Sequence, residues 1–211
     1  MTDTTAPLIP RAALFGNPTR AAGQISPDGR WLSWLAPLDG VMNIWVAPKA
    51  DPDAARAMTS ANQRPIRQHF WAPDSSAVMY IQDKDGDENF LLYRACVTSG
   101  AETCLTPFED TRVDLIAISA TIKDKLLIGL NNRDPQWHDV HLLDLSTGAL
   151  TLVLENNAYA GFEADDTLTL RMAMQQNAGG GTDYFRIEDN VVVAEPFETT
   201  VSMRYDYFVL Q

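Results

Sequence analysis

A repeated pattern of strands and turns constrains this chain more than any other feature. An apolar residue, a polar turn and an alternating apolar strand recur four times, and the turns carry Asp28, Asp74, Asp124 and Asp166. The aspartates are 46, 50 and 42 residues apart. Units of about 40–45 residues with four short strands are typical of propeller blades. The sequence therefore predicts an all-β fold, a partial β-propeller with about four blades of four-stranded antiparallel sheet.

A second turn divides each of the first three units. An aspartate there stands four residues before Asn43, Asn89 or His138, and an apolar strand follows. These landmarks predict the organisation of the chain: an N-terminal arm over residues 1–20, blades over 21–60, 61–110, 111–157 and 158–198, and a stub of a further strand over 199–211.

Four blades leave open the question of how the end blades are covered. Propellers have 4–8 blades, and four-bladed closure is uncommon, so we expect either further blades or a partner surface. Uncovered end blades should expose the apolar residues of 31–35 in the first blade, and some of Leu168, Leu170, Met172, Tyr184 and Phe185 in the fourth. The isolated chain is then expected to self-associate.

The charge of the chain excludes some classes of partner. Sixteen Lys and Arg against 28 Asp and Glu give a net charge of −12, which disfavours nucleic acid and anionic membranes. Met1–Pro10 lacks a basic residue ahead of an apolar stretch, and no apolar run approaches about 20 residues. We expect a soluble cytoplasmic protein, with a periplasmic location left open.

Several stretches resemble one enzyme family. Residues 9–18, followed by Ile25-Ser-Pro-Asp-Gly29, are similar to the opening of bacterial prolyl oligopeptidase-family serine peptidases, in the acylaminoacyl-peptidase-like and dipeptidyl-aminopeptidase-like branch. Residues 82–89 and 132–139 resemble the second- and third-blade turns of that group. The resemblance covers roughly residues 8 to 195. It implies an N-terminal propeller that screens peptides for a C-terminal α/β-hydrolase domain with a Ser-Asp-His triad.

The chain departs from the family at the catalytic machinery. None of its nine serines lies in Gly-x-Ser-x-Gly, the strained turn that presents the nucleophile in such hydrolases. No catalytic residue is therefore assigned, and no cofactor is expected. The resemblance implies the missing hydrolase domain as partner and short peptides as substrates of the intact enzyme. The alternative is a stand-alone propeller that docks other proteins without enzymatic activity, which ring closure would favour.

Two loops supply the candidate interaction residues. Asp83, Asp85, Asp87 and Glu88 form an acidic loop, but its glycine and its twelfth position do not fit a calcium-binding loop, so a turn is predicted rather than a metal site. The other candidates are Arg133, Trp137 and His138. Trp137 is predicted in a turn and exposed, and His138 is interpreted as a turn residue because it replaces Asn43 and Asn89.

The two cysteines flank one predicted hairpin turn. Cys96 and Cys104 lie on either side of Gly100, and hairpin geometry could set them opposite each other. Because a cytoplasmic setting keeps thiols reduced, we predict two free thiols.

Overall fold

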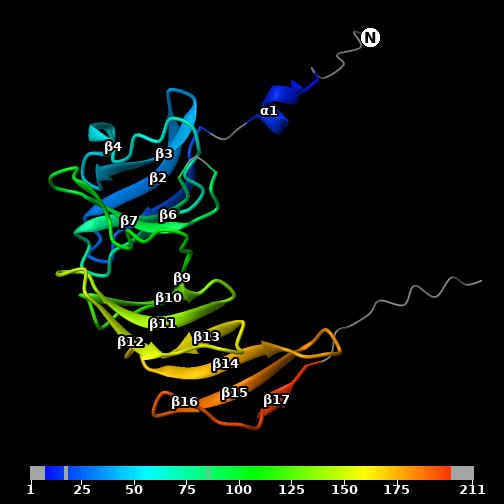
Figure 1. The fold of residues 1–211 in the computed structure, drawn as a ribbon. Coiled ribbons are helices and arrows are strands. Elements are labelled where there is room, and N and C mark those ends of the chain that lie inside the picture. Colours follow the sequence, from blue (N-terminus) through cyan, green and yellow to red (C-terminus); the bar gives the residue numbers. More distant parts are fainter. Residues whose placement is uncertain (1–7, 17–18, 85, 201–211) are drawn as a thin grey trace, which may run out of the picture.

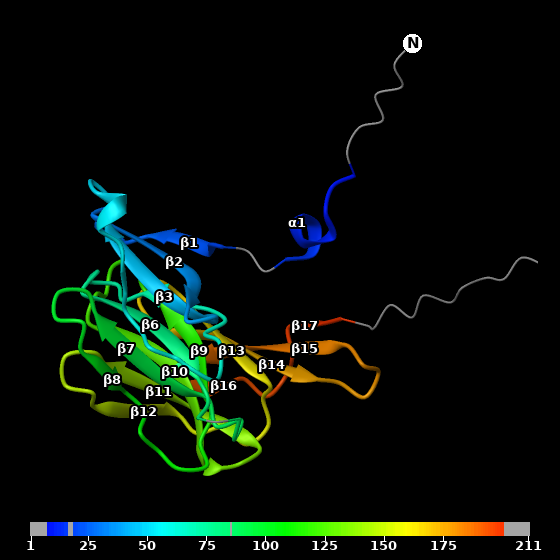
Figure 2. The same cartoon turned by 90° about the horizontal axis from the view of Figure 1, so that it is seen from above.

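Four small antiparallel sheets, stacked in chain order, make up the fold in a computed structural model (Figure 1). The structure describes residues 8–16, 19–84 and 86–200. Seen from above, the sheets overlap (Figure 2), as sheets stacked face to face should. The predicted all-β partial propeller of four blades is confirmed.

Successive strands pair within each sheet. The first sheet contains β1 (Ala21–Ile25), β2 (Trp31–Leu38), β3 (Val41–Pro48) and β4 (Arg56–Ala57). The second contains β5 (Phe70–Trp71), β6 (Ala77–Gln82), β7 (Leu91–Cys96) and β8 (Glu102–Cys104). The third contains β9 (Val113–Ile118), β10 (Lys125–Asp134), β11 (Trp137–Asp144) and β12 (Leu150–Leu154). The fourth contains β13 (Gly161–Ala164), β14 (Leu170–Gln176), β15 (Thr182–Glu188) and β16 (Val191–Val192), with β17 (Glu198–Thr199) also paired to β15.

Helices are short in the described part of the chain. α1 (Arg11–Phe15) lies in the predicted arm, and the 3₁₀ turn η1 (Pro52–Ala54) precedes β4. Among the described residues, no helix has the length and apolar character needed to cross a membrane. The predicted arm and blade boundaries stay predictions, and most of the predicted stub, residues 201–211, lies outside the described residues.

The turn residues explain why the strands reverse where they do. Leu38 pairs with Val41, so Asp39 and Gly40 form a two-residue turn, and both have positive φ (51° and 86°). Asp-Gly favours this turn because its twist matches that of the strands. In the fourth sheet Asp165, rather than the predicted Asp166, accepts hydrogen bonds from the turn backbone at Thr167 and Thr169.

Apolar clusters fill the three spaces between neighbouring sheets. Each cluster combines one face of a sheet with the facing side of the next. The fully buried members include Ile44 and Val78 between the first two sheets, Leu92 and Leu126 in the middle, and Leu127 and Leu170 between the last two. The period-two alternation of the strands thus serves packing on both faces.

The predicted exposure of the end blades is wrong. Trp34 and Leu35 are 8% and 4% exposed. Trp34 packs with Ala36 and Ala47 on the outer face of the first sheet, and the Arg20 guanidinium lies 4.9 Å from its ring centroid. Leu168, Leu170 and Phe185 are also buried, because they face the third sheet rather than the open side. Met172 and Tyr184 are half-buried.

His69 is buried between the first two sheets. Its Nε2 lies 2.8 Å from Ser33 Oγ, and its Nδ1 has no hydrogen-bond partner among the described residues. Burial lowers the pKa of His69 to about 4, since taking charge out of water disfavours the protonated form. His69 is therefore neutral in the folded protein at neutral pH.

This burial predicts a loss of stability in mild acid. Between pH 6.5 and about 4 the unfolded chain binds a proton at His69 that the folded chain does not, so the free energy of unfolding falls as the pH falls. We expect His69 to contribute a drop of about 2 kcal/mol from pH 7 to pH 5. Urea denaturation across this range should show a shallower pH dependence for His69→Gln than for the wild type. Parallel pH profiles for the two proteins would contradict the prediction.

Candidate functional site

Three segments join successive blades, and we call residues 58–69, 105–112 and 155–160 the first, second and third link. Polar contacts between these links and the blades lie near the candidate residues. Equivalent strand positions in the first three blades are occupied by Ile44, Leu92 and Val140. In each blade the residue five positions later donates a backbone hydrogen bond to the turn before the second strand; these donors are Lys49, Val97 and Leu145. By the same count Asn43 corresponds to Asp139. His138 therefore corresponds to Met42, one position earlier than the sequence interpretation placed it.

Each link is held to the preceding blade by a different polar group. Ile44 N donates to Thr59 Oγ1 (3.0 Å), and Thr59 Oγ1 donates to Asn43 Oδ1 (2.8 Å). In the second blade Leu92 N donates to Thr106 Oγ1 (2.9 Å). These hydroxyls and amides are buried, so each satisfies a group that would otherwise be costly to bury.

In the third blade the link is held by an ion pair. Arg133 Nε and Nη2 donate to the two carboxylate oxygens of Asp139 at 2.7 and 2.8 Å, and Nη2 also reaches Asn156 O at 2.6 Å. Asn156 N donates to Asp139 Oδ1 (2.8 Å). Burial alone would raise the pKa of Asp139, but the hydrogen bonds from Arg133 and Asn156 outweigh it and hold the pKa below its usual value.

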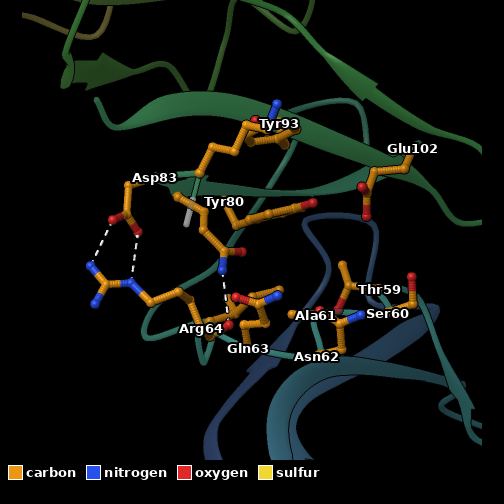
Figure 3. A pocket seen from close by; sticks show the side chains of 13 residues that line it. Thr59, Ser60, Ala61, Asn62, Gln63, Arg64, Tyr80, Asp83, Tyr93 and Glu102 are labelled. Atoms are coloured by element: carbon orange, nitrogen blue, oxygen red, sulfur yellow. Dashed lines mark hydrogen bonds and ion pairs between the residues drawn. The ribbon is translucent and has the colours of Figure 1, made fainter. Parts of the chain in front are cut away.

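A second ion pair borders a cavity of about 220 Å³ between the first link and the second blade (Figure 3). Arg64 Nη2 lies 2.6 Å from Asp83 Oδ2, and the Asp83 side chain is 4% exposed. The hydrogen bond from Arg64 is the main cause of the lowered pKa of Asp83. Across the cavity Tyr80 and Tyr93 stack, with ring centroids 5.2 Å apart.

The rest of the acidic loop forms a turn. Asp87 Oδ1 accepts hydrogen bonds from Lys84 N (3.2 Å) and Asn89 N (3.0 Å). Gly86 and Glu88 have positive φ, 90° and 61°. Asp85 lies outside the described residues. Within the described ranges, no group of three or more His, Cys, Asp or Glu side chains is arranged to hold a metal ion.

Trp137 and His138 are strand residues, so the turn interpretation of both is wrong. They begin β11, and the two-residue turn consists of Pro135 and Gln136. Both side chains are half-buried and line a cavity between the third and fourth blades. His138 Nε2 lies 3.5 Å from Asp114 Oδ2.

The candidate residues thus separate into two places. Asp83 and Glu88 lie near Arg64, whereas Trp137 and His138 line the cavity between the third and fourth blades, and Arg133 holds the neighbouring link. Sequence reasoning missed Arg64 and Asp139. Counting positions from the strand ends rather than from the turn would have found Asp139.

The Ser33–His69 contact is the nearest approach to a catalytic pair. Both residues are buried, at 1% and 4% exposed. A hydrolytic serine needs an accessible hydroxyl and a histidine oriented by a third group. Because His69 Nδ1 meets no such group in the described part of the chain, this pair is a packing contact.

The cysteines do not face each other. Cys104 pairs with Tyr93, whereas Cys96 N donates to Ala101 O. Both thiols are free. Hydrogen bonds from Ser99 and Thr98 lower the pKa of Cys96 to about 6, and burial raises the pKa of Cys104.

The third-blade ion pair yields a stability prediction. Asp139→Ala should lower the free energy of unfolding by about 2–3 kcal/mol, because Asn156 N and Arg133 lose a buried acceptor. Glu155 also approaches Arg133 (3.9 Å) but is 55% exposed, so Glu155→Ala should change stability by less than about 0.5 kcal/mol. Urea denaturation of both variants tests this. Equal losses would show that burial of Asp139 is not what matters.

Comparison with known proteins finds relatives in sequence and in fold. No protein-family model matches the chain. Dipeptidyl aminopeptidase BIII of Pseudoxanthomonas mexicana is 44% identical over 180 residues, a match that covers 85% of this chain and 26% of that protein. The chain therefore spans about a quarter of the length of this relative.

Solved structures show the same fold at low sequence identity. The propeller domain of the trilobed protease from Pyrococcus furiosus gives a TM-score of 0.54 at 18% identity, covering 85% of this chain and 58% of that one. A puromycin-hydrolyzing peptidase of Mycobacterium tuberculosis gives 0.56 at 16% identity, covering 84% and 28%. The sequence relative, the motifs and the fold agree, and the chain is similar to the N-terminal β-propeller part of prolyl oligopeptidase-family peptidases.

Proposed function

We propose that this chain is the non-catalytic, substrate-gating propeller of a serine peptidase that hydrolyses short peptides. The observation that carries the proposal is the 44% identity to dipeptidyl aminopeptidase BIII over 180 residues. The partner is an α/β-hydrolase domain that supplies a Ser-Asp-His triad from residues other than these 211.

The chemistry of the chain supports a role without catalysis. A nucleophilic serine is presented on a strained turn between a strand and a helix, and the serines of this chain lack that motif. The buried Ser33–His69 contact has no orienting acid within the described residues. Bond cleavage must then come from elsewhere in the enzyme.

The arrangement of the sheets supports gating over stand-alone docking. The first and fourth sheets lie at opposite ends of the row (Figure 1), and the three inter-sheet clusters of the described residues join only neighbouring sheets. An independent docking module would be expected to close its ring and cover its end blades. We expect the protein to lie in the cytoplasm.

The first test of the proposal is an activity assay. We expect the purified 211-residue chain to give no turnover of dipeptidyl or acyl-aminoacyl chromogenic substrates and no labelling by a serine-directed fluorophosphonate. Ser33→Ala serves as the control for the buried serine. Turnover or labelling that Ser33→Ala abolishes would overturn the non-catalytic assignment.

Gating requires a catalytic domain. A chimera of dipeptidyl aminopeptidase BIII that carries this chain in place of its matching 180 residues should cleave dipeptidyl substrates and lose activity as peptide length increases. A folded chimera that cleaves long, unfolded polypeptides as fast as short peptides would contradict gating.

We also expect the isolated chain to self-associate through apolar side chains that stay exposed at the two end sheets, such as Ile25, Val191 and Phe197. Light scattering over a concentration series measures this. A mass that stays monomeric at every concentration would contradict the expectation.

A further inference from the structure

One feature that the gating role leaves unexplained is the cavity between the third and fourth blades. Its volume is about 430 Å³, within the range of small-ligand sites. Its walls come from strands of the β9–β12 and β13–β16 sheets and from the link between them. Three aromatic residues contribute to it: Trp137, Tyr159 and Phe162.

Two strand positions that line the cavity are glycines, Gly129 and Gly161. Gly129 pairs with Val140 in the register where the first two blades place Leu35 and Ile81. A Cβ atom at Gly129 would lie 3.1 Å from His138 Cβ. Gly129 does not have a positive φ, so the backbone does not require glycine there. The glycine instead leaves room for the His138 side chain and the space beside it.

A second glycine has the same effect on the opposite wall. A Cβ atom at Gly161 would lie 3.0 Å from Met174 Cε, and Gly161 also lacks a positive φ. Interior glycine weakens a strand and often marks a close approach by another group. Both glycines line the cavity, and each leaves room for a neighbouring side chain, His138 or Met174.

The aromatic wall is held rigidly. The Tyr159 ring makes edge contacts with Phe162 and Phe185, with centroids 6.1 and 5.4 Å apart. The link that carries Tyr159 is fixed by Asn156, whose Oδ1 accepts from Ala158 N and Tyr159 N at 3.1 and 2.9 Å. A ligand ring would therefore meet a surface that is already ordered, which lowers the entropic cost of binding.

Polar groups remain available beside this wall. His138 also lines the cavity, but its Nε2 is buried from solvent and lies 3.5 Å from Asp114 Oδ2. Gln136 and Gln176 place amide side chains at the same cavity.

We propose that this cavity is a binding subsite for a peptide residue with an aromatic side chain. The ring packs against Trp137 and Tyr159 in the cavity, and the flanking peptide amide hydrogen-bonds the side-chain amide of Gln136 or Gln176. The inference rests on the proposed function, because it takes the ligand to be a short peptide reaching the propeller. It assigns the propeller a side-chain preference in addition to a limit on size.

The test uses the 211-residue chain and N-acetyl-phenylalanine amide as the probe. Binding is followed through the Trp137 indole N–H signal in NMR, assigned by its loss in Trp137→Phe. We expect saturable binding with a Kd on the order of 1 mM, as befits a ligand of this size, and at least fivefold weaker binding of N-acetyl-alanine amide. Equal binding of the two probes would overturn the proposal.

Matched variants locate the site. Gly161→Ala adds a methyl group to the cavity wall and should weaken binding at least fivefold. The variant should still fold, because only the flexible end of Met174 must move to admit that group. Gly23→Ala is the control, because a Cβ there meets nothing within 4 Å. Gln176→Ala removes one of the two side-chain amides and should also weaken binding. Unchanged affinity in both Gly161→Ala and Gln176→Ala would overturn the proposal.

A further variant protects the test against misfolding. If Gly161→Ala fails to fold, Ala158→Leu narrows the cavity from the link and should give the same loss. Binding is measured without hydrolysis, so a failure to bind the probe would not change the result of the activity assay. Conversely, turnover by the isolated chain would overturn the proposed function while the binding result stands.

Discussion

Apolar packing between adjacent sheets is the interaction on which the rest of this structure depends. A four-stranded sheet of such short strands has too little area to bury its own apolar faces, so each blade is stable only against its neighbours. The buried residues of the three inter-sheet clusters lie on both faces of the second and third sheets. The Arg64–Asp83 ion pair and the cavity between the third and fourth blades depend on that stacking, because each joins residues from successive parts of the row.

The sequence predicted the architecture because the architecture is local and repeated. Turn residues such as Asp39-Gly40 and the alternation of strands such as Ile44–Val46 are visible in a few residues each. What a blade packs against is not local. The sequence shows that Trp34 and Phe185 are large and apolar, but not that Arg20 covers one or that the other faces inward.

The candidate site was predicted less well, for a related reason. The positions of Trp137 and His138 were inferred from a turn-based alignment that fails where β10 is longer than its counterparts and its pairing with β11 shifts between Leu130 and Asp134. That irregularity moves His138 from the turn to a cavity wall. Arg64 and Asp83 are 19 residues apart and meet only when the first link folds against the second blade.

The three links between blades use different chemistry at equivalent positions: an amide with a hydroxyl, a single hydroxyl, and a carboxylate with a guanidinium. In a chain of similar repeats, a segment can pair with the wrong neighbour during folding. A link that docked on the wrong blade here would leave Asp139 without the N–H of Asn156, or Asn43 without the hydroxyl of Thr59. These different contacts therefore favour one order of the blades, because an exchanged order would leave buried polar groups without hydrogen-bond partners.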